Sequence, residues 1–134
     1  MTAQEKWVMT IRNMQQVRVN YRLLCRERKL KMGRGPRHPR LMKWLEAVEA
    51  AYTALRSRKG KSAARARKDW LIARTIEMMV FEGGKSGLKT GLTGQRRVLS
   101  QQYVDRMAEE ALRMIMKEAW EAGLLGRRPQ RQKT

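Results

Sequence analysis

Apolar residues recur every three or four positions along four segments of this chain, and this spacing restricts the fold more than any other feature. Side chains at that interval share one face of an α-helix, whereas a half-buried strand alternates at every second residue. No segment alternates in that way, and no internal repeat is found. The sequence therefore predicts an all-α fold, a compact bundle of about four helices.

The first predicted helix spans residues 3–31. Thr2 and Glu5 stand at its start, in the T-x-x-E spacing that is typical of a capping box. Residues 33–40 contain two glycines and two prolines, which end the helix in a stiff basic connector. Its apolar stripe comprises Trp7, Ile11, Met14, Val17, Tyr21 and Leu24. At ~1.5 Å per residue this helix is about 40 Å long, so its far end is expected to project toward a partner.

Three further helices follow. The second is expected to begin near Pro39, and residues 57–61 end it. Ser62 is the expected N-cap of the third helix, and Ser100 that of the fourth, which Gly123 ends. The third helix is predicted to direct these residues toward the core: Ala64, Leu71, Ile72, Thr75, Met78 and Met79.

The remaining segments contain little to bury. Residues 83–94 include five glycines and are predicted to form a long, mobile, basic loop. Residues 127–134 have no apolar content and are predicted to be a flexible basic tail. The domain prediction is one helical domain over residues 1–126, followed by that tail.

The net charge restricts the class of partner. The chain has 31 Lys and Arg against 12 Asp and Glu, a formal charge of +19 with a pI near 11.3. Nucleic acid, an acidic membrane surface or an acidic protein would each complement this charge, and nucleic acid is favoured. Apolar runs such as residues 78–81 are far too short to cross a bilayer, so no membrane partner is expected.

The positive charge is concentrated in the first hundred residues. Residues 1–40 hold 11 basic and 2 acidic side chains, residues 41–99 hold 13 and 5, and residues 100–134 hold 7 and 5. The fourth helix is thus expected to expose a slightly negative face. The helical cations form two stripes at three- and four-residue steps, one on the first helix and one at the start of the third.

Such stripes are often merely solvated, but phosphate-backbone contacts need only cations spaced along a surface. Two connectors and the glycine-rich loop add further cations. The predicted nucleic-acid-binding residues are Arg18, Arg22, Arg26, Lys29, Arg34, Arg37, Arg40, Lys59, Lys61, Arg65, Lys68, Lys85, Lys89, Arg96 and Arg97.

No motif indicates catalysis, a metal or a cofactor. Gly84-Lys85-Ser86 resembles the end of a phosphate-binding loop, but Met79 occupies the position of the first required glycine. His38 has no catalytic companion nearby in sequence, and is interpreted as a loop residue or a phosphate contact. With one cysteine, Cys25, no internal disulfide can form, which favours a reducing, cytoplasmic setting. The chain is therefore expected to be a non-enzyme without cofactors.

The four tryptophans fall one in each predicted helix, which is typical of core packing. Trp70 lies beside the second basic stripe, and is the best candidate for stacking on an exposed base. Cys25 is expected to be a partly buried packing residue.

These patterns predict a basic helical protein that binds RNA or DNA mainly through the phosphate backbone, as a small subunit or regulator in a nucleoprotein assembly. RNA or single strands are favoured. An alternative is an adaptor that docks on an acidic surface of a polymerase or nuclease. Membrane-surface association through the first helix ranks last, because its apolar stripe is needed for the core. In size, charge and helicity the chain resembles the small helical subunits of CRISPR effector complexes, and equally the small regulators of phages and mobile elements.

Overall fold

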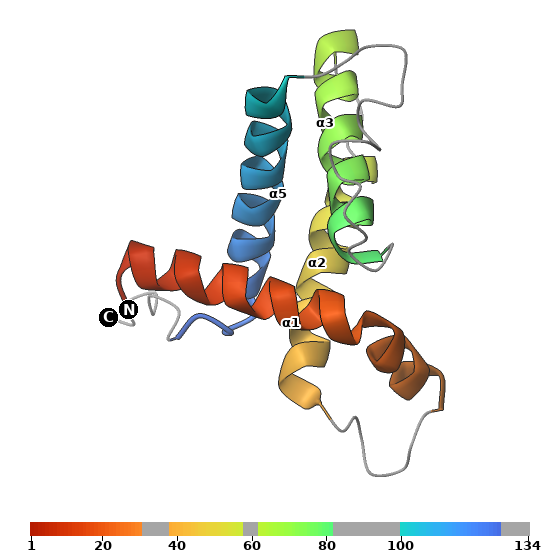
Figure 1. The fold of residues 1–134 in the computed structure, drawn as a ribbon, viewed down its shortest axis with the longest axis vertical. Helices are drawn as coiled ribbons and strands as arrows, with labels where there is room; N and C mark the ends of the chain where they lie inside the picture. The colour runs from red at the N-terminus through yellow and green to blue at the C-terminus, as the bar shows by residue number, and fades with distance from the viewer. Residues whose placement is uncertain (31–37, 58–61, 82–99, 127–134) are drawn as a thin grey trace, which may run out of the picture.

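The computed structural model describes residues 1–30, 38–57, 62–81 and 100–126, and these are helical almost throughout (Figure 1). The elements are α1 (Ala3–Leu30), α2 (Pro39–Ser57), α3 (Ala63–Ile76), the π-helix η1 (Glu77–Phe81) and α5 (Gln101–Glu121). Within these ranges there is no strand, so the all-α prediction is confirmed. The predicted glycine-rich loop and basic tail lie outside the described residues.

Helices α1, α3 and α5 begin at the predicted capping residues Thr2, Ser62 and Ser100. At α1, the backbone N–H of Glu5 donates to Thr2 Oγ1 at 3.1 Å, and Thr2 N–H reaches Glu5 Oε1 at 3.5 Å. Ser62 Oγ accepts from the backbone of Arg65 at 3.3 Å, and Ser100 Oγ accepts from that of Tyr103 at 3.2 Å. Each cap satisfies an amide that has no partner inside the helix.

The end of α5 is set by Gly123. This residue has φ +79°, a left-handed conformation that a side chain rarely adopts. The turn brings the N–H of Leu124 to the carbonyl oxygen of Ala119 at 2.9 Å, the bond of a Schellman motif. Leu124 and Leu125 are buried, so the turn also returns apolar side chains to the core.

Helices α2, α3 and α5 pack against one another, and α1 crosses them (Figure 1). In this view α3 and α5 run downward toward α1, and α2 runs upward behind α3. Helix α1 contacts α2, η1 and α5. The largest fully buried side chains come from every helix and include Leu24, Trp44, Leu45, Leu55, Ile76, Met107 and Ile115. A single core therefore joins α1 to the other three helices.

Two details of the third helical segment differ from the prediction. Ala64 was expected to face the core but is exposed. The same is true of all of residues 62–68, so the buried part of α3 begins only at Asp69. The segment also does not remain α-helical to its end, because residues 77–81 widen into a π-turn. That turn buries Met78 and Val80 and leaves Met79 half-buried. A single π-turn within a helix is frequently associated with function.

Candidate nucleic-acid interface

The first predicted stripe of cations lies on one exposed side of α1, and we call it the α1 basic flank. Val17 and Leu24 are fully buried on the opposite side of the same helix. The flank extends from Arg18 to Lys29, eleven steps along the helix, which corresponds to about 16 Å. Its four members are all exposed: Arg18, Arg22, Arg26 and Lys29.

No carboxylate in the described part of the chain forms an ion pair with the α1 basic flank. The nearest acidic residue in sequence, Glu27, has a side chain only 9% exposed, and its Oε1 lies 3.0 Å from Nδ1 of His38. Arg18, Arg22 and Arg26 are four residues apart, a spacing at which like charges repel on a helix. The flank thus carries positive charge that no carboxylate of the described residues neutralises, and the repulsion destabilises α1.

Arg28 behaves differently from its neighbours on α1. Its Nη1 and Nη2 donate to the two carboxylate oxygens of Glu49 on α2, each at 2.8 Å. This bond raises the pKa of Arg28 despite the opposing effect of burial. A fork of this kind fixes geometry between two helices. Arg28 therefore ties α1 to α2 and does not belong to the flank.

Two cations of the predicted α3 stripe, Arg65 and Lys68, face a partner helix. Lys68 Nζ lies 2.9 Å from Glu110 Oε1 on α5, and both side chains are partly exposed. Arg65 and Lys68 line a hollow of about 320 Å³ whose other side is formed by α5, including Glu110 and Arg113. Glu110, an acidic side chain of the last helix, thus lies beside the α3 stripe. The carboxylate of Glu110 therefore competes with any phosphate for the ammonium group of Lys68.

Arg40 has an internal contact as well. Its Nη2 donates to the carbonyl oxygen of Leu124 at 3.2 Å, which joins the start of α2 to the turn after α5. The side chain is otherwise exposed. The other predicted binding residues lie outside the described part of the chain: Arg34, Arg37, Lys59, Lys61, Lys85, Lys89, Arg96 and Arg97.

Exposed arginines that were not among the predicted contacts include Arg12, Arg56 and Arg67. Arg67 precedes Trp70 by three residues, so both side chains project from the same side of α3. That spacing is visible in the sequence and could have identified Arg67. Arg56 comes from α2, and only the packing of α2 on α3 brings it to the same surface.

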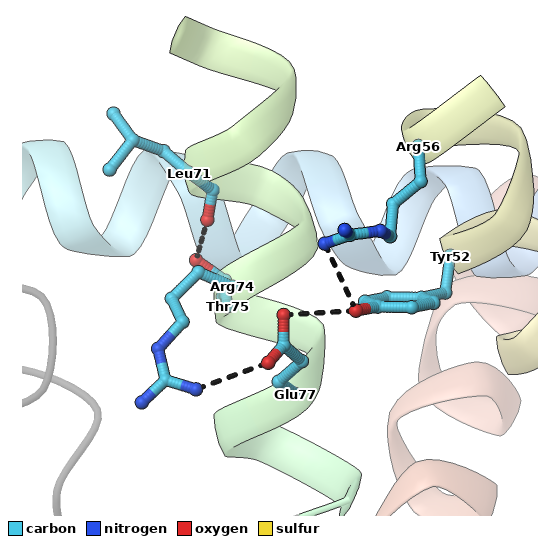
Figure 2. Close-up of polar contacts among 6 residues, drawn as sticks. All are labelled: Tyr52, Arg56, Leu71, Arg74, Thr75 and Glu77. Atoms are coloured by element: carbon cyan, nitrogen blue, oxygen red, sulfur yellow. Dashed lines mark hydrogen bonds and ion pairs between the residues drawn. The ribbon is translucent and has the colours of Figure 1, made fainter. Parts of the chain in front are cut away.

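A polar chain of four residues joins α2 to α3 and η1 (Figure 2). Tyr52 Oη donates to Glu77 Oε2 at 3.1 Å, and Arg74 Nη1 donates to Glu77 Oε1 at 3.2 Å. Arg56 Nη1 reaches Tyr52 Oη at 3.4 Å, with its guanidinium 5.7 Å from the ring centre. Burial and the bond to Glu77 raise the pKa of Tyr52. This polar chain holds Arg56 in place, and no carboxylate of the described residues forms an ion pair with it.

Aromatic packing continues from this chain to α1. The Phe81 ring lies 5.3 Å from Tyr52 and 5.5 Å from Tyr21, measured between ring centres. Burial raises the pKa of Tyr21 to about 12, and its hydrogen bond with Cys25 adds to the effect. Cys25 is half-buried, as expected for a packing residue. These contacts anchor η1 between α1 and α2.

The described ranges contain no group of three side chains that could hold a metal ion. Nor does any helix in them combine the length and apolarity needed to cross a membrane. Comparisons with protein-family models, curated proteins and solved structures return no match.

Proposed function

We propose that this chain is a non-enzymatic nucleic-acid-binding protein that contacts RNA or DNA mainly through the phosphate backbone. The observation that carries the proposal is the α1 basic flank. Its four exposed cations have no ion-pair partner among the described residues, although they lie close together on one helix. A polyanion would relieve that repulsion by replacing water and chloride with phosphate.

The dimensions of the flank fit this role. Its length of about 16 Å corresponds to about five phosphate spacings along one strand of a duplex. Arginine and lysine at three- and four-residue steps supply charge along that length without a fixed order of side chains. Such contacts position a nucleic acid but do not read its sequence. A small subunit or regulator of a cytoplasmic nucleoprotein assembly is the setting in which we expect this activity.

The test is direct binding as a function of salt. Fluorescence anisotropy with labelled single-stranded RNA and duplex DNA of equal length should give affinities that fall steeply as salt rises. The expected slope of log K against log salt is about −0.7 to −0.9 for each phosphate neutralised. Binding that is absent for both probes, or insensitive to salt, would contradict the proposal.

A second candidate is an adaptor that docks on an acidic protein surface. It is favoured by exposed apolar side chains on α1, since Val19 is 75% exposed and Leu23 is 40% exposed close to the flank. Apolar groups beside arginines are typical of protein interfaces. Here a partner should be retained after nuclease digestion and lost when Val19→Asp is introduced. Retention that depends on nucleic acid would instead favour the first candidate.

A further inference from the structure

Trp70 is exposed, unlike the other three tryptophans. Trp44 is fully buried, and Trp7 and Trp120 are half-buried. The Trp120 ring is covered by Lys6, whose Nζ lies 4.5 Å from the ring centre. Trp70 is 41% exposed, and no aromatic or cationic side chain among the described residues lies over its ring. The structure therefore leaves this indole available to a ligand.

The surface beside Trp70 is hollowed because its neighbours are small. Ala66 lies four residues before Trp70 on α3, and Ala73 lies three residues after it. Together with the end of α2 they border a hollow of about 180 Å³ next to the indole. Its lining is Leu55, Arg56, Ala66, Asp69, Trp70 and Ala73. A flat group can thus approach the indole without displacing a large side chain.

One arginine lines this hollow, and a second is exposed on α3 close to Trp70. Arg67 is exposed one turn before Trp70 and has no ion pair with any residue that the structure describes. Arg56 lines the hollow and is held by the hydroxyl and ring of Tyr52, which are uncharged (Figure 2). Both guanidinium groups therefore retain their positive charge for an anionic ligand. Asp69 contributes a buried carboxylate, which disfavours a phosphate inside the hollow.

We propose that Trp70 stacks on an unpaired nucleobase, while Arg56 and Arg67 contact the phosphates on either side of it. The inference rests on the proposed function and adds the class of nucleic acid, since it requires a single strand. Bases in a duplex are already stacked on each other and present only their edges, whereas a single strand offers whole faces. An indole beside cations is the arrangement that binds single strands with little sequence preference.

The test compares single-stranded and duplex probes at one salt concentration. Labelled 12-nucleotide oligouridine and a 12-base-pair DNA duplex are titrated with the unaltered chain and with Trp70→Ala. Loss of one stacked base should weaken oligouridine binding by about 5-fold to about 150-fold and leave duplex binding within about twofold. Trp70→Phe retains a ring and should lose less than Trp70→Ala. Val8→Ala truncates another apolar side chain that is 42% exposed, so it serves as the control and should leave both affinities unchanged.

The outcomes distinguish a failure of the stacking site from a failure of nucleic-acid binding as a whole. If the unaltered chain binds neither probe, the proposed function fails and the stacking site fails with it. If it binds and Trp70→Ala leaves oligouridine affinity unchanged, or weakens both probes equally, only the stacking site is overturned. Indole fluorescence gives a second readout should Trp70→Ala not fold. Oligouridine should quench the emission of the unaltered chain and quench that of Trp70→Phe much less, and equal quenching would also overturn the inference.

Discussion

Helices α1 and α3 are both rich in cations, but the structure gives those cations different surroundings. On α1, the four members of the basic flank are exposed and have no carboxylate partner in the described residues. On α3, Lys68 pairs with Glu110, and Arg74 pairs with Glu77. The difference arises because Glu110 on α5 lies beside Lys68, and because Glu77 follows Arg74 by three residues in the same helical segment. Net charge alone therefore does not reveal which cations can bind a polyanion.

The largest expected effect comes from neutralising the α1 basic flank. Replacing Arg18, Arg22, Arg26 and Lys29 together with glutamine should weaken binding of RNA or DNA at low salt by about 100-fold or more, because four phosphate contacts are lost. Glutamine keeps the helix, so circular dichroism should be unchanged. The control is a double variant on α5, Arg106→Gln with Lys117→Gln. An equal loss of binding affinity for each charge removed there would contradict a localised interface.

The next effect tests which side of α1 faces the core. Val17 is fully buried and Val19 is 75% exposed, although they are only two positions apart in the sequence. Val17→Ala should lower the free energy of unfolding by about 2 kcal/mol, through lost burial and a residual cavity. Val19→Ala should change it by less than about 0.5 kcal/mol. Urea unfolding measures both, and similar losses would mean that the flank is misplaced on the helix.

A smaller effect concerns the polar chain that holds Arg56. Tyr52→Phe removes the hydroxyl that donates to Glu77, and should cost about 1 kcal/mol at neutral pH. The pKa of Tyr52 is raised in the folded state, so its contribution is complete below the unfolded tyrosine pKa of about 10. That contribution is lost as pH rises through the folded value, because the unfolded chain ionises first. The free energy of unfolding, measured up to pH 11, should decline less steeply in Tyr52→Phe than in the unaltered chain, and equal slopes would contradict the role of this hydroxyl.

The smallest expected effect comes from removing the ion-pair partner of Lys68, which would leave this cation of α3 as unpaired as those of the α1 basic flank. Glu110→Gln removes the carboxylate that lies 2.9 Å from Lys68, and so releases that ammonium for phosphate. Partly exposed pairs are worth about 1 kcal/mol at most, so affinity should rise by no more than about fivefold. Asp105→Asn changes the net charge equally but releases no cation, because this carboxylate accepts from Gln101 and is in no ion pair among the described residues. If both variants bind alike, the pairing of Lys68 does not limit binding.

Local signals in the sequence predicted the helices well. The Thr2, Ser62 and Ser100 caps and the stop at Gly123 depend on nearby residues, and all four are confirmed. The exposure of Ala64 and the π-turn of residues 77–81 depend on where α3 meets its neighbours, so periodicity could not show them. Periodicity also could not show that Arg56 lies near Trp70, because only the packing of α2 on α3 brings both residues to one hollow.

For the candidate interface, sequence spacing identified the exposed stripe on α1 because a helix fixes which side chains share a side. It did not identify the ion pair of Lys68 with Glu110 or the contact of Arg40 with Leu124, since both join segments distant in the chain. Trp70 was the expected stacking candidate, and its exposure agrees with that expectation. Its binding to a base stays a prediction.

The most direct test of the α1 basic flank is the difference in salt dependence between the unaltered chain and its four-glutamine variant. The slope of log K against log salt counts the phosphates that are neutralised. If the flank is the principal contact surface, the magnitude of the slope should fall by about 3, which is four contacts at about 0.7 to 0.9 each. An unchanged slope would place the phosphate contacts elsewhere on the chain and contradict this account.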